Sequence, residues 1–378
     1  MSPDALEVEW IEDPSRFALM QREWDELLQD SYADCLFLTW EWLHTWWEHL
    51  AGERRLHLFT VRRAGQLLAI APLVVRPRQP ERLLPFEALE FLGMGAVGSD
   101  YLDFIVRRGT EEDVLEAVAD HLAGCGRVLE LRQVRAGSRF SSRVAARLQK
   151  AGWAASLAIT DVCPYLDLAG HSWDSYLAGV GSAHRQNVRR RLRRLAASFQ
   201  VEFQQVRSEA QRRECLPLFA RLHRLRWAGR RGSDALDGEG IMEFHDAFTR
   251  IALQRGWLRL FMLNLDGKPA ASLYAFRYGR AFYFYQSGFD PAYRNHSVGL
   301  VAMAFGIQRA LEEGADEYDL LHGDEEYKFL WARGGRDLVR FDCYPPGVEG
   351  TFCRRAVDIR RGLKRVVHWP QQFLYPEP

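Results

Sequence analysis

Residues 281–330 read AFYFYQSGFDPAYRNHSVGLVAMAFGIQRALEEGADEYDLLHGDEEYKFL, and this stretch decides the fold. The run Ala281–Phe289 is rich in aromatic residues and is bounded by turn residues, which predicts a strand. Apolar residues recur at helical spacing over Val298–Glu313, which predicts an amphipathic helix. Tyr318–Leu321 predicts a second short strand. The order strand, polar turn, helix and strand is that of a βαβ unit.

The polar turn of this unit, Tyr293–Ser297, lies directly before the helix. Ser297 suits the N-cap, and Gly314 suits the position after the last helical turn. Free backbone N–H groups and the positive end of the helix dipole meet at such a turn. The sequence therefore predicts that an anionic group binds there.

A hairpin precedes the unit, because Trp257–Leu265 and Pro269–Tyr278 flank Asp266-Gly267, a strong turn signal. A similar pair, Leu56–Arg62 and Gln66–Val75, occurs in the first half of the chain. Each pair is followed by further strand and helix patterns. The two halves therefore have a similar predicted layout, although no repeat is visible residue by residue.

Two tracts, Tyr283–Gly299 and Asp319–Lys328, resemble the GNAT acyltransferase superfamily. The resemblance is strongest to its CelD-like branch, which is associated with cellulose and other exopolysaccharide biosynthesis and is distantly related to FemAB-type transferases. It implies an α/β (α+β) fold of tandem GNAT-like domains, each with a mixed, mostly antiparallel central sheet flanked by helices. Residues 1–170 would form the acceptor-side domain and residues 171–347 the domain with the acyl donor site.

Residues 348–378 form a basic, amphipathic tail. Its apolar positions recur at helical spacing and are Phe352, Ala356, Ile359, Leu363 and Val366. We expect a C-terminal helix that packs on the body of the protein. The alternative is peripheral contact with an anionic membrane surface.

The resemblance also implies the donor site. Acetyl-CoA or another acyl-CoA would be the co-substrate, and its site would be formed by Gln286, Ser287, Arg294, Asn295, His296, Ser297 and Gly299. Only Arg294 and Gly299 correspond to the six-residue GNAT phosphate loop, and their spacing differs from the standard one. The identity of the donor stays open for this reason.

The proton-handling residues are expected after the last strand of the βαβ unit, because ligands gather at the carboxyl ends of strands. The candidates for catalysis are Asp319, His322, Tyr327 and Lys328. His322 suits a general base near neutral pH, and a hydrogen-bonded turn histidine is the alternative. Tyr327-Lys328 matches a Tyr-Lys pair of the family. We expect Lys328 or Arg294 to be the partner of Asp319.

The candidate acceptor-binding residues lie in the first half and are Trp42, Trp46, Asp100 and Tyr101. Trp42 and Trp46 share one face of a predicted helix, since they are four residues apart. Their rings would stack on a sugar, or alternatively fill the core. Asp100 follows a glycine-rich loop that we expect at the cleft between the domains.

Composition excludes several classes of protein. The formal net charge is +0, with 50 basic and 50 acidic residues, which does not favour a nucleic-acid partner. A cluster of arginines between residues 184 and 194 reads as a solvated helix face or a phosphate contact, with transfer RNA less favoured. The six cysteines show no metal-ligand spacing, so no metal is expected. No signal peptide or membrane span is visible, which favours a cytoplasmic protein.

The sequence therefore predicts an acyl-CoA-dependent N- or O-acyltransferase. The acceptor would be a sugar or amino-sugar precursor in exopolysaccharide or cell-envelope biosynthesis. Two alternatives stay open. One is a FemAB-like transferase that uses aminoacyl-tRNA, and the other is a non-catalytic GNAT-fold module of a polysaccharide-synthesis complex.

Overall fold

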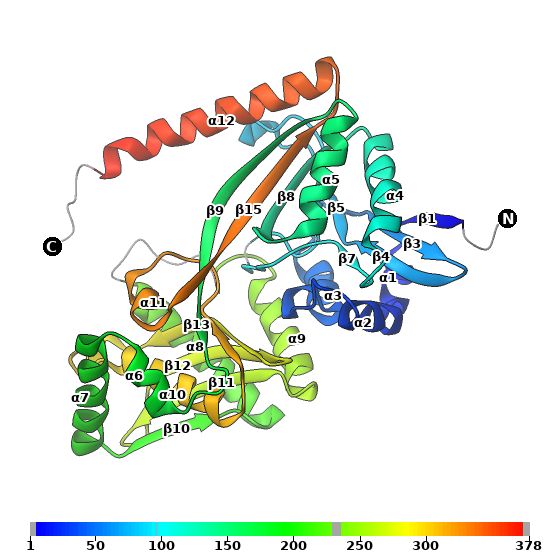
Figure 1. Cartoon of the computed structure of the whole chain (residues 1–378). Coiled ribbons are helices and arrows are strands. Elements are labelled where there is room, and N and C mark those ends of the chain that lie inside the picture. Colours follow the sequence, from blue (N-terminus) through cyan, green and yellow to red (C-terminus); the bar gives the residue numbers. More distant parts are fainter. Residues whose placement is uncertain (1–4, 96, 229–235, 373–378) are drawn as a thin grey trace.

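Strands from both halves of the chain join in one 11-stranded sheet, beside a separate 4-stranded sheet (Figure 1). The computed structural model describes residues 5–95, 97–228 and 236–372. The large sheet has the order β10-β11-β12-β13-β14-β9-β15-β8-β6-β5-β2, and the small sheet has the order β1-β3-β4-β7. Helices flank the sheets, and most strand pairs are antiparallel. The expected fold class is confirmed.

The elements of the first half are β1 (Leu6–Ile11), α1 (Pro14–Leu19), α2 (Gln21–Gln29), η1 (Leu36–Leu38), α3 (Trp40–Leu50), β2 (Arg55–Leu56), β3 (Leu58–Arg63), β4 (Gln66–Ala71), β5 (Leu73–Arg76), η2 (Pro80–Arg82), β6 (Ala88–Phe91), β7 (Ile105–Val106), α4 (Glu111–Gly124), β8 (Val128–Arg135), α5 (Arg139–Lys150) and β9 (Ala154–Asp167).

The elements of the second half are α6 (Trp173–Gly179), α7 (Ser182–Ser198), β10 (Val201–Gln205), α8 (Glu209–Trp227), α9 (Ile241–Gln254), β11 (Leu258–Leu265), β12 (Lys268–Tyr278), β13 (Ala281–Phe289), η4 (Pro291–His296), α10 (Val298–Glu312), β14 (Glu317–Asp319), α11 (Glu326–Trp331), β15 (Gly334–Tyr344) and α12 (Val348–Gln372).

Each half contains one parallel strand pair connected through a helix. β6 pairs with β8 across α4, and β13 pairs with β14 across α10. The second pair is the βαβ unit that the sequence predicts. Its hairpin is also as predicted, since β11 and β12 pair around Asp266 and Gly267, which both have positive φ. Positive φ at both central residues is the geometry of a type I′ turn.

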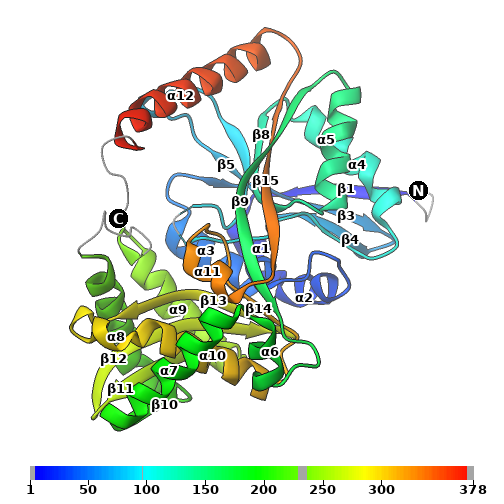
Figure 2. The same cartoon turned by 60° about the vertical axis from the view of Figure 1, so that its left-hand side comes forward.

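The two halves exchange their last strands. β9, at the end of the first half, pairs with β14, and β15, at the end of the second half, pairs with β8. β9 and β15 also pair with each other along most of their length, so two long neighbouring strands run through both halves (Figure 2). Residues that are far apart in the sequence therefore come together along β9 and β15.

Strand β14 is short, so it pairs with only the first part of β13. Its pairing with β13 ends at Tyr283 and Asp319, while β13 continues to Phe289. The strand does not extend through Leu321 as expected, because Leu321 has a positive φ of 55°. The edge of β13 beyond Tyr283 consequently has no strand partner in the described part of the chain.

Helix α12 packs against β15 at the far end of the molecule. Cys353 and Val357 of this helix are buried in a small apolar cluster. Phe352 and Ile359, expected on the packed face, are 57% and 60% exposed. The side chains of Leu363 and Val366 lie outside the described residues. Across the described ranges, none of the helices is long and apolar enough to span a bilayer.

Candidate active site

A pocket of about 250 Å³ opens where β13 and β14 separate. It is lined by Val97, Gly98, Arg226, Trp227, Phe284, Tyr285, Gln286, Ser287, Leu320, Leu321, His322, Gly323, Glu325, Tyr327 and Lys328. These residues come from β13, the segment after β14, α8, α11 and the glycine-rich loop of the first half. The pocket therefore belongs to both halves of the chain.

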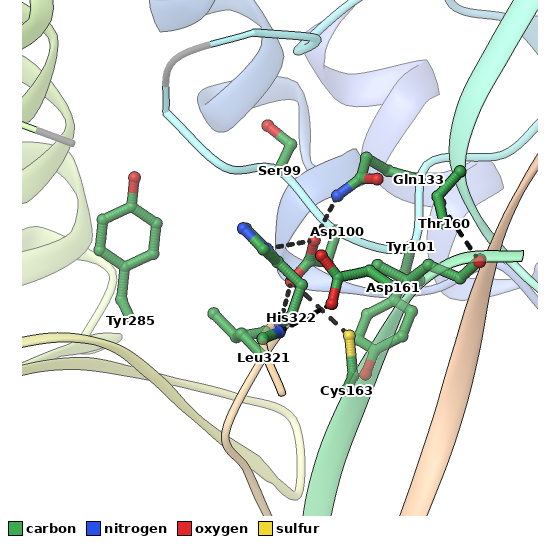
Figure 3. A network of polar contacts seen from close by, with 12 residues as sticks. Ser99, Asp100, Tyr101, Gln133, Thr160, Asp161, Cys163, Tyr285, Leu321 and His322 are labelled. Carbon is green, nitrogen blue, oxygen red and sulfur yellow. Dashed lines mark hydrogen bonds and ion pairs between the residues drawn. The ribbon is translucent and has the colours of Figure 1, made fainter. Parts of the chain in front are cut away.

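His322, which lines the pocket, is paired with Asp100 behind it (Figure 3). Asp100 is completely buried, and its Oδ1 lies 2.9 Å from Nδ1 of His322. The same carboxylate accepts the backbone N–H of His322 at 2.9 Å and the side-chain amide of Gln133 at 3.0 Å. Asp100 therefore fixes both the backbone and the ring of His322.

The hydrogen bond to Asp100 also decides the tautomer of His322. A carboxylate can only accept, so Nδ1 donates its proton and Nε2 is left as the acceptor. The hydrogen bond and the negative charge of Asp100 raise the pKa of His322 above its ordinary value. In Figure 3 the free ring nitrogen points away from Asp100, toward the side of the pocket where Tyr285 lies. This is the arrangement of a general base.

Two further side chains hold the turn that carries His322. Asp161 of β9 accepts the backbone N–H of Gly323 at 3.0 Å. The ammonium group of Lys328 donates to the carbonyl oxygens of Leu321 and His322 at 3.3 and 2.6 Å. Lys328 is only 4% exposed and also pairs with Glu325. In this structure Lys328 therefore positions the turn that carries His322.

The backbone is strained around this pair. Tyr101, Gln133 and Leu321 are non-glycine residues with φ between 55° and 60°. Each is adjacent to Asp100 or His322 in sequence, or is bonded to Asp100. Such conformations cost on the order of 1–3 kcal/mol each and persist where the surroundings enforce them, often at functional sites.

Asp319 lies beside this network and not within it. Its carboxylate accepts the hydroxyl of Tyr101 at 2.7 Å and a guanidinium N–H of Arg336 at 3.2 Å. The expected partners Lys328 and Arg294 are thus wrong, because β15 brings Arg336 alongside and Lys328 is used on the turn. Burial outweighs these contacts and raises the pKa of Asp319 to about 7.

Strand β13 supplies the other wall of the pocket. Gln286 lies opposite Tyr274 and Phe284 lies opposite Ala275, so Tyr285 is the extra residue of a β-bulge. Its hydroxyl donates to the carbonyl oxygen of Val97 in the first half. Bulges of this kind redirect side chains and leave backbone groups unpaired next to active sites.

The expected donor residues divide into two groups. Gln286 and Ser287 line the pocket, whereas Arg294, Asn295, His296, Ser297 and Gly299 do not. The latter lie on η4 and at the start of α10, where the expected open turn is instead a short 3₁₀ helix. Ser297 makes no side-chain cap on α10. The first backbone N–H groups of α10 therefore receive no acceptor from the side chain of Ser297, and the predicted donor site at this turn stays a prediction.

Trp42 and Trp46 are part of the core and are not a platform for an acceptor. They are 0% and 1% exposed, and the indole N–H of Trp42 donates to Ser99 at 2.9 Å. A buried ring has no free face for a sugar. Asp100 and Tyr101, predicted as acceptor-binding, instead hold His322 and Asp319. No local signal in the sequence singled out Asp161, Gln133 or Arg226 as residues of this site.

The βαβ unit that carries the pocket lies in the part of the chain that matches a known family. Residues 182–329 match the family model described as an acetyltransferase (GNAT) domain. The range includes β13, α10, β14 and His322. The second half of the chain thus has a GNAT-type acyltransferase fold, and the resemblance to that superfamily is confirmed for this region.

Solved structures extend the likeness in fold to almost the whole chain. FemX superimposes with a TM-score of 0.59 at 14% identity, over 88% of this chain and 96% of FemX. The C-terminal domain of a putative lysylphosphatidylglycerol synthetase from Agrobacterium fabrum gives 0.53 at 11% identity, over 92% and 96%. L-PGS from Bacillus licheniformis gives 0.53 at 12% identity, over 91% and 96%. The comparison with curated proteins returned no match.

Proposed function

We propose that this protein is an acyl-CoA-dependent N- or O-acyltransferase whose general base is His322. The observation that carries the proposal is the hydrogen bond between His322, which lines the pocket at the separating strands, and the buried Asp100, in a chain with a GNAT-type fold. The acyl thioester of the donor supplies the electrophilic carbonyl. The residues of this chain must position it, remove a proton from the acceptor and stabilise the oxyanion.

In the proposed mechanism, Nε2 of His322 accepts the proton of the acceptor amine or hydroxyl as that group attacks the acyl carbon. Asp100 stabilises the imidazolium that forms, because it is completely buried and hydrogen-bonded to Nδ1. The imidazolium then returns the proton to the departing thiolate. The free edge of β13, including the bulge at Tyr285, offers backbone N–H groups to the developing oxyanion.

Positive charge on α7 supports a donor that carries phosphates. Arg191 of α7 donates to the carbonyl oxygen of Asn295, so this helix lies against η4. Arg189, Arg190, Arg193 and Arg194 are exposed on the same helix. Arginine suits phosphate recognition because its planar fork donates several hydrogen bonds at once.

We propose as acceptor a sugar or amino-sugar precursor of exopolysaccharide or cell-envelope biosynthesis, which rests on the resemblance to the CelD-like branch. The same basic helix would also suit an aminoacyl-tRNA, the donor implied by the FemAB-type resemblance. Both donors are polyanions, so the helix does not distinguish between them.

Calorimetry with acetyl-CoA, followed by thiol release in the presence of a panel of sugars and amino sugars, tests the function. We expect acetyl-CoA to bind and thiol release to depend on acceptor, with His322→Gln retaining binding but losing turnover. No binding at millimolar acetyl-CoA would reject the CoA donor. Binding of transfer RNA that survives moderate salt would then favour the aminoacyl donor, and binding of neither would favour a non-catalytic module.

We also propose a peripheral membrane contact through α12. The exposed Phe352 and Ile359 lie on this helix together with the exposed Arg354 and Arg355. Apolar side chains beside arginines suit an anionic bilayer surface. Replacing Phe352 and Ile359 by serine should reduce co-sedimentation with anionic liposomes, and equal recovery of both proteins would reject the contact.

A further inference from the structure

Arg226 is a pocket-lining cation that has no acidic partner in the described part of the chain. It lies near the end of α8 and reaches the pocket beside β13. One guanidinium nitrogen, Nη1, donates to the hydroxyl and the carbonyl oxygen of Ser287. The other guanidinium nitrogens make no hydrogen bond to the described residues.

Three aromatic rings hold the guanidinium in place. Its central carbon lies 5.1 Å from the ring centre of Trp227 and 5.8 Å from those of Phe289 and Tyr327. Cation–π contacts of this kind fix a guanidinium without neutralising it. Arg226 is therefore oriented by its surroundings while its charge and most of its N–H groups stay available.

The other charges that line the pocket are already paired. His322 is paired with Asp100, and Lys328 is paired with Glu325 and donates to two carbonyl oxygens. Arg226 thus gives the pocket an excess positive charge at a defined position. Phe289, one of its three rings, also lies within 3.5 Å of the position a Cβ would take at Gly299, at the start of α10. Phe289 therefore contacts both the guanidinium of Arg226 and the start of α10.

We infer that Arg226 binds an oxyanion, a phosphate or a carboxylate, of one of the two substrates. This inference rests on the proposed transferase function, because it assigns a substrate group to the same pocket. A guanidinium fork binds such groups through two parallel hydrogen bonds, and Nε with Nη2 presents that geometry. The oxyanion belongs either to the acceptor or to the phosphates of the donor, and the two sources can be separated by experiment.

The test compares wild type, Arg226→Gln and Arg226→Lys by calorimetry with matched pairs of probes. Glucosamine 6-phosphate and glucuronate are compared with glucosamine and glucose, and acetyl-CoA is compared with S-acetylpantetheine, which lacks the phosphates of CoA. Arg221→Gln is the control, because Arg221 lies exposed on the same helix and outside the pocket.

We expect wild type to bind one charged probe more tightly than its neutral partner by about ten- to a hundredfold. Arg226→Gln should abolish this preference, Arg226→Lys should keep part of it, and Arg221→Gln should leave it intact. Loss confined to the sugar phosphate or the uronate assigns the oxyanion to the acceptor, and loss confined to acetyl-CoA assigns it to the donor.

The inference is overturned if wild type shows no preference for any charged probe, or if Arg226→Gln keeps the wild-type preference. Equal loss for charged and neutral probes would also overturn it, since Arg226 would then only support the pocket. These outcomes are separate from failure of the proposed function. A protein that binds the sugar phosphate through Arg226 but transfers no acyl group would retain the oxyanion site and lose the transferase assignment.

Discussion

Nδ1 of His322 lies 2.9 Å from Oδ1 of Asp100, although the two residues are 222 positions apart in the chain. One residue comes from the glycine-rich loop of the first half and the other from the turn after β14. Because β9 of the first half pairs with β14 of the second, the halves are held in register at this point. The proposed catalytic base is complete only when both halves are folded together.

Asp100→Asn should lower kcat by roughly 10²- to 10⁴-fold, since the amide no longer stabilises the imidazolium or fixes the tautomer. The base acts as neutral imidazole, so the rate should rise with pH through the raised pKa of His322, above the ordinary value near 6.5. The midpoint should move to lower pH in the variant. Rate profiles and NMR titration of His322 measure both effects, and an unchanged midpoint would contradict the pairing.

The buried carboxyl of Asp319 should make the protein less stable as pH rises. Its pKa is raised to about 7 from 3.8, so the folded state holds a proton that the unfolded state has lost. The free energy of unfolding should therefore fall between about pH 4 and pH 7. The variant Asp319→Asn imitates the protonated form and should show a smaller decline. Urea unfolding at several pH values gives the comparison, and parallel curves for the two proteins would count against the assignment.

Lys328→Met should lower both stability and turnover. The carbonyl oxygens of Leu321 and His322 would lose their donor, at a cost of about 1–3 kcal/mol. The His322 ring should also shift, which NMR of the imidazole would report. Glu325→Gln is the control, because it removes the charge of the partner and leaves the carbonyl contacts. A fall in kcat without any change at His322 would instead indicate direct contact between Lys328 and the substrate.

Gly98→Ala should reduce kcat more than it reduces stability. Gly98 has a φ of 58°, and an added Cβ would lie 3.1 Å from Cε1 of His322. The ring must then move relative to Asp100. Gly52→Ala is the matched control, since Gly52 has a φ of 56° and open space around it. Both variants place an alanine at a positive φ, so the two differ only in the contact with His322. Equal kcat values for the two variants would contradict this account.

Trp42→Ala should destabilise the protein by about 3–5 kcal/mol, as expected for a large side chain removed from a core. Trp42→Phe keeps most of the buried area and loses the hydrogen bond to Ser99. Thermal unfolding and the acceptor KM distinguish the two roles of this residue. We expect a loss of stability with KM unchanged. A raised KM without a loss of stability would instead support a role of Trp42 in binding the acceptor.

The local pattern predicted much of the fold. Turn chemistry at Asp266-Gly267 and apolar spacing over residues 298–313 depend only on neighbouring residues, and the hairpin and α10 appear as expected. His322 likewise lies after a strand, as predicted, and lines the pocket, while its role as general base stays a prediction. The resemblance gave the superfamily of residues 182–329, which the family match confirms. In these cases the deciding interactions are short in sequence.

Tertiary structure alone decided which side chains meet. The partner of His322 is Asp100 and that of Asp319 is Arg336, because the exchange of β9 and β15 brings distant segments together. Burial likewise depends on every element that packs around a residue, so only the tertiary structure decided between the two readings of Trp42, in favour of the core. A sequence pattern contains the spacing of residues along one segment, whereas a hydrogen bond or a buried contact between distant residues depends on how two segments are placed in space.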